Sequence, residues 1–246
     1  MDTKRVELFR DKLNGFDYGE YNANLMDLLL QYPDVVACKG DKLGLTNVIE
    51  HRVNLERGTH PIYIPAYRIP VKVKSEVEKI VNEWEKEGII RKSSSPFNFP
   101  LLAVPKKDGS YRVCVDFRKL NDKTVPDRYP AACLSDLVSG IGGKKIYSST
   151  DLLQGFLQVP LAETSKPYTA FSTPYGHWEF ERMPFGLRDS PKTFTRLVNT
   201  IFHGMIGKSV FIYMDDLLVG SNTIEEHLTI LREVLNRLRI AGLKLK

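Results

Sequence analysis

Two adjacent carboxylates, Asp215 and Asp216, lie between two short apolar runs of the sequence. These runs, residues 210–213 and 217–219, have the composition and length of buried β-strands. Because aspartate is rare in strands and common in turns, residues 214–216 are predicted to form the tight turn of a β-hairpin. Neighbouring ionised carboxylates repel each other, and a hard divalent cation such as Mg²⁺ relieves that repulsion while leaving room for substrate phosphates. The pattern therefore predicts a metal-binding hairpin tip.

A third carboxylate, Asp151, lies in a short strand-like run at residues 147–152, and Gly155 and Phe156 follow where the chain must turn. Three carboxylates on two elements suit phosphoryl transfer, in which two metal ions about 3.5–4 Å apart activate a hydroxyl and stabilise the leaving oxygen. Taken alone, Asp151 is equally well explained as a helix or turn cap, and Phe156 is better explained as a core side chain.

A basic hairpin is predicted upstream of these carboxylates. Residues 101–105 and 111–117 have strand-like composition, and the Asp-Gly pair between them is a strong hairpin signal. Lys106 and Lys107 lie on its loop, with Arg112 just beyond. Taken alone, this loop is better explained as a solvated charged tip. The alternative is a finger that closes over phosphates, with Lys as a point charge and Arg as a fork.

Helical periodicity and capping residues predict the elements that position these groups. Helices are expected over residues 22–32 and 75–87, the second with Ser75 and Glu78 as a capping box and Gly88 at its end.

Two further helices are predicted in the second half of the chain. Ser190 is a good N-cap with Pro191 at the first helical position, and Thr223 with Glu226 caps a last helix that Gly242 ends. The apolar face of the first of these helices is predicted to be core: Phe194, Leu197, Val198, Ile201 and Phe202.

Two strand predictions complete this outline. Arg118 and Lys119 are expected to follow on the far strand of the basic hairpin. A second hairpin is predicted from strands over residues 169–171 and 178–182, turned by residues 174–177.

The N-terminal part of the chain is predicted to be an approach segment, residues 1–70, ahead of a main region over residues 71–246. Three prolines and two tyrosines in residues 58–70 favour an extended strap that lies on the surface of something else. A plain interdomain linker explains this composition equally well.

The overall composition is that of an ordinary globular chain of 246 residues, with 42% hydrophobic and 26% charged residues. A net charge of +5 favours a polyanionic partner only weakly. The three cysteines are widely spaced and indicate neither a disulfide framework nor a zinc site, so a reducing compartment is expected. No apolar run is long enough to cross a bilayer, and the N-terminus leads into a polar segment rather than a signal sequence. His177, His203 and His227 lack metal-ligand spacing and are given no role.

The sequence around Asp215 resembles the Tyr-x-Asp-Asp box of reverse transcriptases, as Tyr213-Met214-Asp215-Asp216. Four further motifs match the family in order: VPKKDGSYR with VDFRKLN (residues 104–112 and 115–121), STDL with GF (149–152 and 155–156), KPYTAFSTPYGH (166–177) and MPFGL (183–187). The resemblance is to gypsy-type LTR retrotransposons, in which a segment like residues 61–70 precedes the polymerase, and it covers roughly residues 45–246.

This resemblance implies roles for the acidic residues and the primer side of the site. Asp151 and Asp215 would bridge two Mg²⁺ ions, with Mn²⁺ as the alternative metal, and Asp216 would be the less directly engaged third carboxylate. Tyr213 and Met214 would border the primer end.

It also implies a nucleotide site. Lys106 and Arg112 would contact the triphosphate, with Lys107 as the alternative to Lys106. Phe185 and Gly186 would line the nucleotide pocket and the template contact. A further aromatic residue, Phe156, stands where the family places a gate, and a bulky ring beneath the sugar leaves no room for a 2′-hydroxyl.

The implied fold is α+β: the fingers and palm of a right-hand polymerase, with an antiparallel palm sheet backed by helices. The sequence contains no Asp-Thr-Gly or Asp-Ser-Gly protease motif, and it ends near residues 242–246, before the family's primer grip. A fragment or truncated copy is therefore expected, with the thumb missing.

The implied function is template-directed DNA synthesis from RNA and DNA templates by two-metal-ion nucleotidyl transfer, within a retrotransposon polyprotein. The implied partners are the template-primer duplex, dNTPs and the thumb, connection, RNase H and integrase regions, with no membrane. The implied location is intracellular, in the cytoplasm, a retrotransposon particle or the nucleus. The alternative is a truncated or domesticated non-catalytic remnant that keeps the fold and binds nucleic acid. An RNA-dependent RNA polymerase is disfavoured by Phe156.

Overall fold

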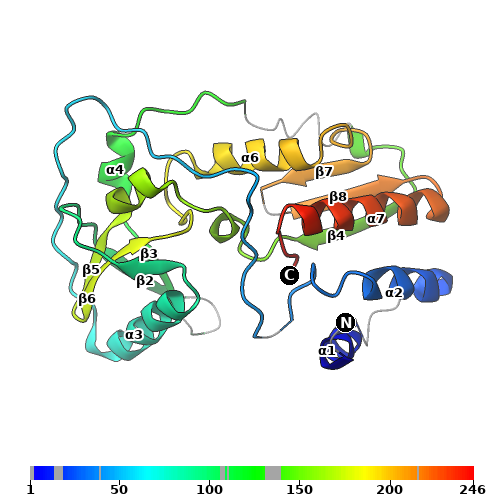
Figure 1. Ribbon diagram of the computed structural model, residues 1–246, viewed down its shortest axis with the longest axis horizontal. Helices are drawn as coiled ribbons and strands as arrows, with labels where there is room; N and C mark the ends of the chain where they lie inside the picture. The colour runs from blue at the N-terminus through cyan, green and yellow to red at the C-terminus, as the bar shows by residue number, and fades with distance from the viewer. Residues whose placement is uncertain are drawn as a thin grey trace. The chain divides into compact units, whose positions relative to one another are not determined.

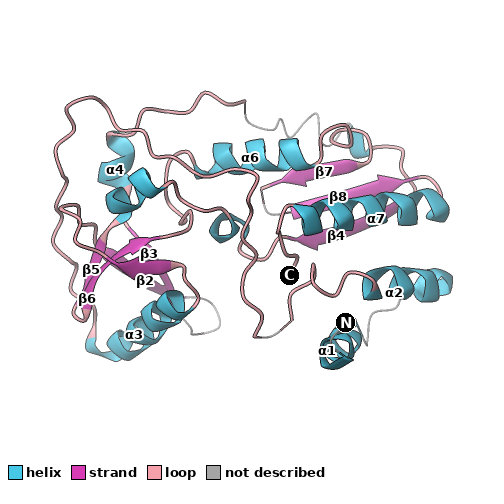
Figure 2. Cartoon of the chain, in the orientation of Figure 1, coloured by secondary structure: helices cyan, strands magenta, loops and turns pink. Residues whose placement is uncertain are grey.

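The computed structural model describes residues 3–13, 19–38, 40–105, 109, 111–130, 140–214 and 216–246 (Figure 1). The chain forms two compact units, and each contains its own antiparallel sheet structure (Figure 2). Unit 1 consists of Met1–Val48, Pro130–Gly155 and Phe194–Lys246, and unit 2 of Ile49–Tyr129 and Phe156–Thr193. Within the described ranges, no helix is long and apolar enough to cross a membrane. The proposed division of the sequence at residue 70 stays a prediction.

The sheet of unit 1 has three antiparallel strands in the order β4-β8-β7. Their bounds are Ile146–Asp151 for β4, Val210–Tyr213 for β7 and Asp216–Ser221 for β8. The hairpin predicted around the paired carboxylates is confirmed, but Asp216 is the first residue of a strand rather than part of the turn. It pairs with Tyr213 on one side and Asp151 on the other, so two strand ladders outweigh its preference for turns.

The helices of unit 1 pack on its sheet and on one another. The long helix α7 (Ile224–Ile240) packs against β8 and β4, and α2 (Asn22–Leu30) packs against α7 and α1 (Thr3–Leu13). A short 3₁₀ turn, η1 (Gly19–Tyr21), precedes α2. The predicted cap of α7 is confirmed, because Thr223 accepts a hydrogen bond from the Glu226 N–H at 3.3 Å.

Unit 2 contains a three-stranded sheet in the order β1-β6-β5 and a separate hairpin of β2 and β3. The bounds of its strands are Ile90–Lys92 (β1), Leu101–Pro105 (β2), Tyr111–Val115 (β3), Phe171–Thr173 (β5) and Gly176–Phe180 (β6). Its helices are α3 (Val71–Lys86), α4 (Arg118–Asp122) and the 3₁₀ segments η2 (Gly155–Gln158), which begins in unit 1, and η3 (Glu163–Thr169). An aromatic cluster forms the core: Trp84, Phe99, Phe117, Phe171 and Phe180.

Two boundaries in unit 2 differ from the sequence prediction. Helix α3 begins at Val71 rather than at Ser75, because Pro70 has the extended backbone of an N-cap and its carbonyl accepts the N–H of Val73 at 2.9 Å. The capping-box pattern of Ser75 and Glu78 therefore lies inside the helix and does not start it.

The far strand of the basic hairpin ends at Val115, and Arg118 and Lys119 belong to helix α4 instead. The carboxylate of Asp116 accepts the backbone N–H of Arg118 at 3.2 Å, which turns the chain out of the strand. The hairpin itself is confirmed, with Pro105 opposite Tyr111.

The turn between β5 and β6 is shorter than predicted. Thr173 pairs with Gly176, so residues 174–175 make the turn, and Gly176 and His177 lie in β6. Thr169, predicted to begin β5, ends the 3₁₀ segment η3.

Helix α6 (Ser190–Ile201) begins in unit 2 and continues in unit 1, and the apolar face predicted for it is buried. The predicted strap is extended and lies along unit 2, where Ile64 N–H donates to the Asn98 carbonyl at 2.8 Å. The Asn98 N–H in turn donates to the Ile62 carbonyl at 2.9 Å, so this segment is hydrogen-bonded to the unit rather than a free linker.

Candidate active site

Asp151 and Asp216 lie directly opposite each other at one edge of the unit 1 sheet. Asp151 is the last residue of β4 and Asp216 the first of β8, and antiparallel pairing places these two strand ends side by side. The pKa of Asp216 is raised, first because its carboxyl shares a hydrogen bond with Asp151, then by burial and by the neighbouring negative charge. The Asp151 side chain is 47% exposed, and the Lys246 ammonium lies 3.9 Å from its Oδ2.

This carboxylate pair suits a hard divalent cation by its chemistry. Both residues supply oxygen ligands, which Mg²⁺ prefers, and a bound cation would relieve the repulsion between the two carboxylates. Asp215, the third predicted ligand, lies outside the described residues. Among the described residues, no cluster of three or more His, Cys, Asp or Glu side chains could hold a metal.

Two non-glycine residues near these carboxylates have a left-handed backbone. Met214, which precedes Asp215, has φ 53°, and Gln154, three residues after Asp151, has φ 48°. Such conformations cost about 1 kcal/mol or more each and tend to occur at functional sites. Tyr213 and Met214, predicted to border the primer end, are both exposed at the β7 end of the hairpin.

A buried histidine holds the two carboxylate-bearing strands to α7. His227 Nε2 lies 2.8 Å from the Ser148 hydroxyl on β4, and its Nδ1 lies 2.8 Å from the Ser221 hydroxyl on β8. Burial lowers the pKa of His227, although Glu226 opposes this, so the ring is neutral near pH 7. Sequence reasoning gave His227 no role, because it lacks metal-ligand spacing and its partners, on β4 and β8, lie 79 and 6 positions away.

In unit 2, three of the predicted nucleotide-site residues form a stack, which we call the aromatic shelf. The Arg112 guanidinium lies over the Phe185 ring, 5.0 Å from its centroid. The rings of Phe185 and Phe156 are 5.3 Å apart between centroids and tilted by 34°. These distances fit a cation–π contact and an aromatic pair, so the shelf holds its members together before any ligand binds.

The loop that carries Phe185 and Gly186 is fastened by Asn121, a residue that sequence reasoning did not assign to the site. The Asn121 side chain donates to the Gly186 carbonyl at 2.8 Å and accepts the Arg188 N–H at 2.8 Å. The Arg188 guanidinium in turn donates to the carbonyls of Asn121 and Thr124. Gly186 has φ +94°, which disfavours any side chain at that position. Asn121 is thus a two-point clamp on the loop.

The lysines predicted to reach the triphosphate, Lys106 and Lys107, lie outside the described residues. Their hairpin is described on either side of them, and Gly109 has φ +82°, as a tight turn requires. Of the three basic residues predicted to bind the triphosphate, Arg112 is the one that the structure describes.

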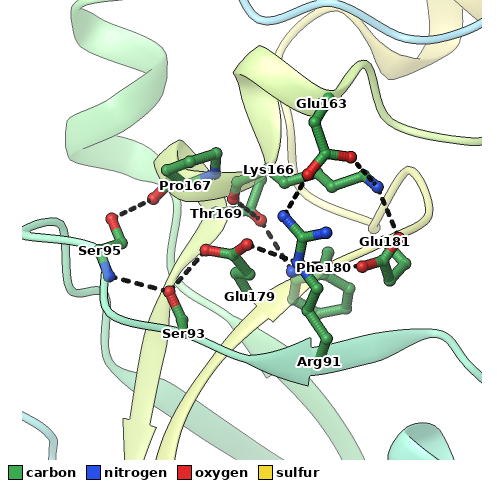
Figure 3. A network of polar contacts seen from close by, with 10 residues as sticks. All are labelled: Arg91, Ser93, Ser95, Glu163, Lys166, Pro167, Thr169, Glu179, Phe180 and Glu181. Carbon is green, nitrogen blue, oxygen red and sulfur yellow. Dashed lines mark hydrogen bonds and ion pairs between the residues drawn. The ribbon is translucent and has the colours of Figure 1, made fainter.

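A charged network joins η3 to β1 and β6 in unit 2 (Figure 3). The Arg91 guanidinium contacts Glu179 at 2.7 Å, Glu163 at 2.5 Å and Glu181 at 3.0 Å, and the Lys166 ammonium contacts Glu163 and Glu181 at 2.6 Å each. Burial lowers the pKa of Lys166, but the hydrogen bonds to Glu163 and Glu181 outweigh burial and leave it raised. The network joins η3 to the sheet of unit 2 and stabilises that contact.

The family described as "Reverse transcriptase (RNA-dependent DNA polymerase)" matches residues 104–246. Among curated proteins, the chain is 40% identical to the "Retrovirus-related Pol polyprotein from transposon 297" of Drosophila melanogaster over 99% of its own length. It is 41% and 36% identical to the corresponding polyproteins of the transposons opus and gypsy of the same organism, each over 75% of the chain. The matches cover 23%, 19% and 18% of these three relatives, so the chain spans less than a quarter of their length.

Solved structures of foamy viral protease-reverse transcriptase are also similar. The structure described as in complex with RNA/DNA hybrid has a TM-score of 0.84 and 26% identity, and the match covers 98% of this chain and 32% of that one. The structure described as in complex with dsDNA has a TM-score of 0.83 and 27% identity, with 98% and 49% covered. The fold is therefore the α+β fold of polymerase palm and fingers. The chain belongs to the reverse transcriptase family, within the group of gypsy-type LTR retrotransposon Pol polyproteins.

Proposed function

We propose that this chain is the catalytic palm and fingers of an RNA-directed DNA polymerase that copies RNA and DNA templates for a retrotransposon. The observation that carries the proposal is the direct pairing of Asp151 with Asp216, at the end of a hairpin whose sequence is Tyr213-Met214-Asp215-Asp216. The hydrogen bond with Asp151 is the first cause of the raised pKa of Asp216, and a bound cation would relieve the repulsion between the two carboxylates.

Asp151 and Asp215 would hold two Mg²⁺ ions, with Mn²⁺ as the alternative metal and Asp216 as a third, less direct ligand. When bound, the ions activate the primer 3′-hydroxyl and stabilise the leaving pyrophosphate. The protein's own contribution is to keep the carboxylates in register, which the paired strands β4 and β8 do, and to hold those strands on α7 through His227.

The incoming nucleotide would be bound by unit 2. Arg112 and Lys106, or Lys107 in its place, would neutralise the triphosphate. The aromatic shelf of Arg112, Phe185 and Phe156 would carry the base and sugar, and the Phe156 ring would exclude a 2′-hydroxyl by its bulk. Gly186 would let the loop backbone approach the nucleotide and template closely.

The proposed partners are a template-primer duplex, dNTPs and the other regions of the polyprotein. Support for the duplex comes from the foamy viral structures, which are described as complexes with RNA/DNA hybrid and with dsDNA. The exposed Tyr213 and Met214 would then border the primer end. The polyprotein assignment rests on the curated relatives, which are Pol polyproteins.

Primer extension tests this function. The chain is given an RNA template with a DNA primer, dNTPs and Mg²⁺, and Asp151→Asn is compared with Asp122→Asn, an exposed aspartate on α4. We expect extension by the wild type and by Asp122→Asn, and a loss of about 10²–10³-fold in Asp151→Asn, the size of effect that follows removal of one group that stabilises charge in a transition state. The same assay is run on a longer polyprotein segment that contains this chain. If neither form extends a primer, the chain is a non-catalytic member of the family and the proposal fails.

A further inference from the structure

The strand end that carries Asp151 is hydrogen-bonded to residues 242–246, which we call the tail. The Lys246 N–H donates to the Asp151 carbonyl at 2.9 Å, and the Leu153 N–H donates to the Lys244 carbonyl at 3.0 Å. The tail is therefore bonded to the backbone both at Asp151 and two residues beyond it. Backbone bonds of this kind fix where a strand ends, and with it the position of the last side chain.

On its other side the tail is hydrogen-bonded to a segment near the N-terminus. We call this segment, residues 31–38 and 40–45, the N-terminal brace. The Leu245 N–H donates to the Val35 carbonyl at 2.8 Å, and the Ala37 N–H donates to the Leu245 carbonyl at 2.9 Å. Leu245 also forms a bridge with Leu152 on its opposite side. All four of these side chains are buried. Figure 1 shows the C terminus beside the extended chain that follows α2. The tail thus lies between the brace and the end of β4.

Side chains of α7 hold the brace in place. The Arg239 guanidinium pairs with the Asp34 carboxylate, donates to the Gln31 carbonyl at 2.8 Å and lies 4.3 Å from the centroid of the Tyr32 ring. Arg232 donates to the Gln31 side chain at 2.7 Å. One arginine with an ion pair, a carbonyl bond and a cation–π contact anchors a segment better than an isolated surface pair does.

The brace and the tail also approach each other closely at Gly242. The Leu45 N–H donates to the Gly242 carbonyl at 3.0 Å. A Cβ at Gly242 would lie 2.5 Å from the Leu45 carbonyl oxygen, a distance that real Cβ atoms essentially never show. Any side chain at this position must therefore displace either the brace or the tail.

We propose that the N-terminal brace is a positioning element for Asp151, and that it acts through the tail. The proposal rests on the proposed function, in which Asp151 is a metal ligand. The brace lies outside the region that the reverse transcriptase family matches, residues 104–246, yet it belongs to the same compact unit as the carboxylates. Residues 31–45 are accordingly part of the polymerase core rather than a linker in front of it.

The test compares Gly242→Ala with Gly204→Ala. Both glycines have positive φ, +69° and +83°, and both lie in unit 1, so both variants carry the same kind of backbone strain. A Cβ at Gly204 meets no atom within 4 Å, whereas a Cβ at Gly242 meets the brace. The difference between the two variants therefore isolates the contact between brace and tail.

Hydrogen exchange of the whole chain gives a readout that does not depend on activity. We expect Gly242→Ala to raise amide exchange at Leu153 by about tenfold or more, because its acceptor in the tail moves, and Gly204→Ala to leave it unchanged. Equal exchange at Leu153 in both variants would overturn the proposal.

Primer extension provides the second readout. We expect Gly242→Ala to lower kcat by about tenfold and to raise the Mg²⁺ concentration needed for half-maximal rate, while the affinity for the primer-template duplex is unchanged. Gly204→Ala should keep the Mg²⁺ dependence of the wild type. An active wild type in which both variants share one Mg²⁺ dependence would refute positioning. A wild type without activity would sink the proposed function, and hydrogen exchange would still decide whether the brace holds the Asp151 strand.

A second pair of variants covers the case in which Gly242→Ala does not fold. Arg239→Gln removes the anchor of the brace, and Arg237→Gln removes an arginine of the same helix that bonds instead to the carbonyls of Ile201 and His203. Arg239→Gln is expected to raise exchange at Leu153 and the Mg²⁺ requirement relative to Arg237→Gln. Identical behaviour of these two variants would contradict the proposal.

Discussion

His51 makes the stability of unit 2 depend on pH. The side chain is 1% exposed, and its Nδ1 lies 2.8 Å from the Thr193 hydroxyl. Its backbone is hydrogen-bonded on both sides, from its N–H to the Pro160 carbonyl and from the Ala162 N–H to its own carbonyl. Burial lowers the pKa of His51 from 6.5 to about 4, although the charge of Asp127 opposes this. The ring is therefore buried in its neutral form.

The size of the effect follows from the pKa difference. A folded pKa of about 4 against an unfolded value of 6.5 corresponds to about 3 kcal/mol of unfolding free energy. Because the folded pKa of His51 is depressed, the unfolded state binds the proton more readily between these values. The stabilisation is fully present above pH 6.5 and is lost as the pH falls toward 4. About 2 kcal/mol of it should be gone at pH 5.

Urea unfolding followed by tryptophan fluorescence measures this effect. Both tryptophans of the chain, Trp84 and Trp178, lie in unit 2, so the signal reports the unit that contains His51. We expect the wild type to lose about 2 kcal/mol more than His51→Asn between pH 7.5 and pH 5. His60→Asn, which changes an exposed histidine of the same unit, should behave as the wild type does. Equal losses in the wild type and His51→Asn would refute the reasoning.

Three further predictions concern the site and its support. Lys166→Met leaves Glu163 and Glu181 without their ammonium partner and should destabilise unit 2 by about 2 kcal/mol in the same fluorescence assay, and an unchanged unfolding midpoint would contradict the network's role. Asn121→Asp removes the donor to the Gly186 carbonyl and should raise the KM for dNTP by about tenfold with little change in kcat, whereas an unchanged KM would show that the clamp is not needed. Phe156→Val should increase ribonucleotide incorporation in primer extension, and no increase would count against the gate.

The sequence predicts the carboxylate hairpin and the capped helix α7 correctly, because local rules dominate there. The apolar runs around Asp216 are short and β-rich, and Thr223 with Glu226 forms a capping box at the start of an amphipathic stretch. The same capping rule misplaces the start of α3, because a competing cap at Pro70 lies one turn earlier. Local rules fail where two candidate signals stand close together.

The residues that support the site are not predictable from local patterns. Asn121 and His227 act through partners 65 and 79 positions away, at Gly186 and Ser148. The pairing of Leu245 with Val35 joins segments from opposite ends of the sequence. No periodicity or motif signals such contacts, because they depend on how distant segments meet in the folded chain. The resemblance to a known family locates the motifs proposed to be catalytic, whereas only the structure identifies what holds them.

Asp151, together with Asp215 and the less direct Asp216, is proposed to hold the divalent metal ions for nucleotide addition. The most direct measurement is an Mn²⁺ titration followed by electron paramagnetic resonance, in the presence of a primer-template duplex and a dNTP that cannot be incorporated. Asp151→Asn is compared with the wild type and with Asp122→Asn. We predict that the wild type and Asp122→Asn bind Mn²⁺ alike, and that Asp151→Asn binds it at least about tenfold more weakly. Equal Mn²⁺ affinity in all three proteins would contradict the claim.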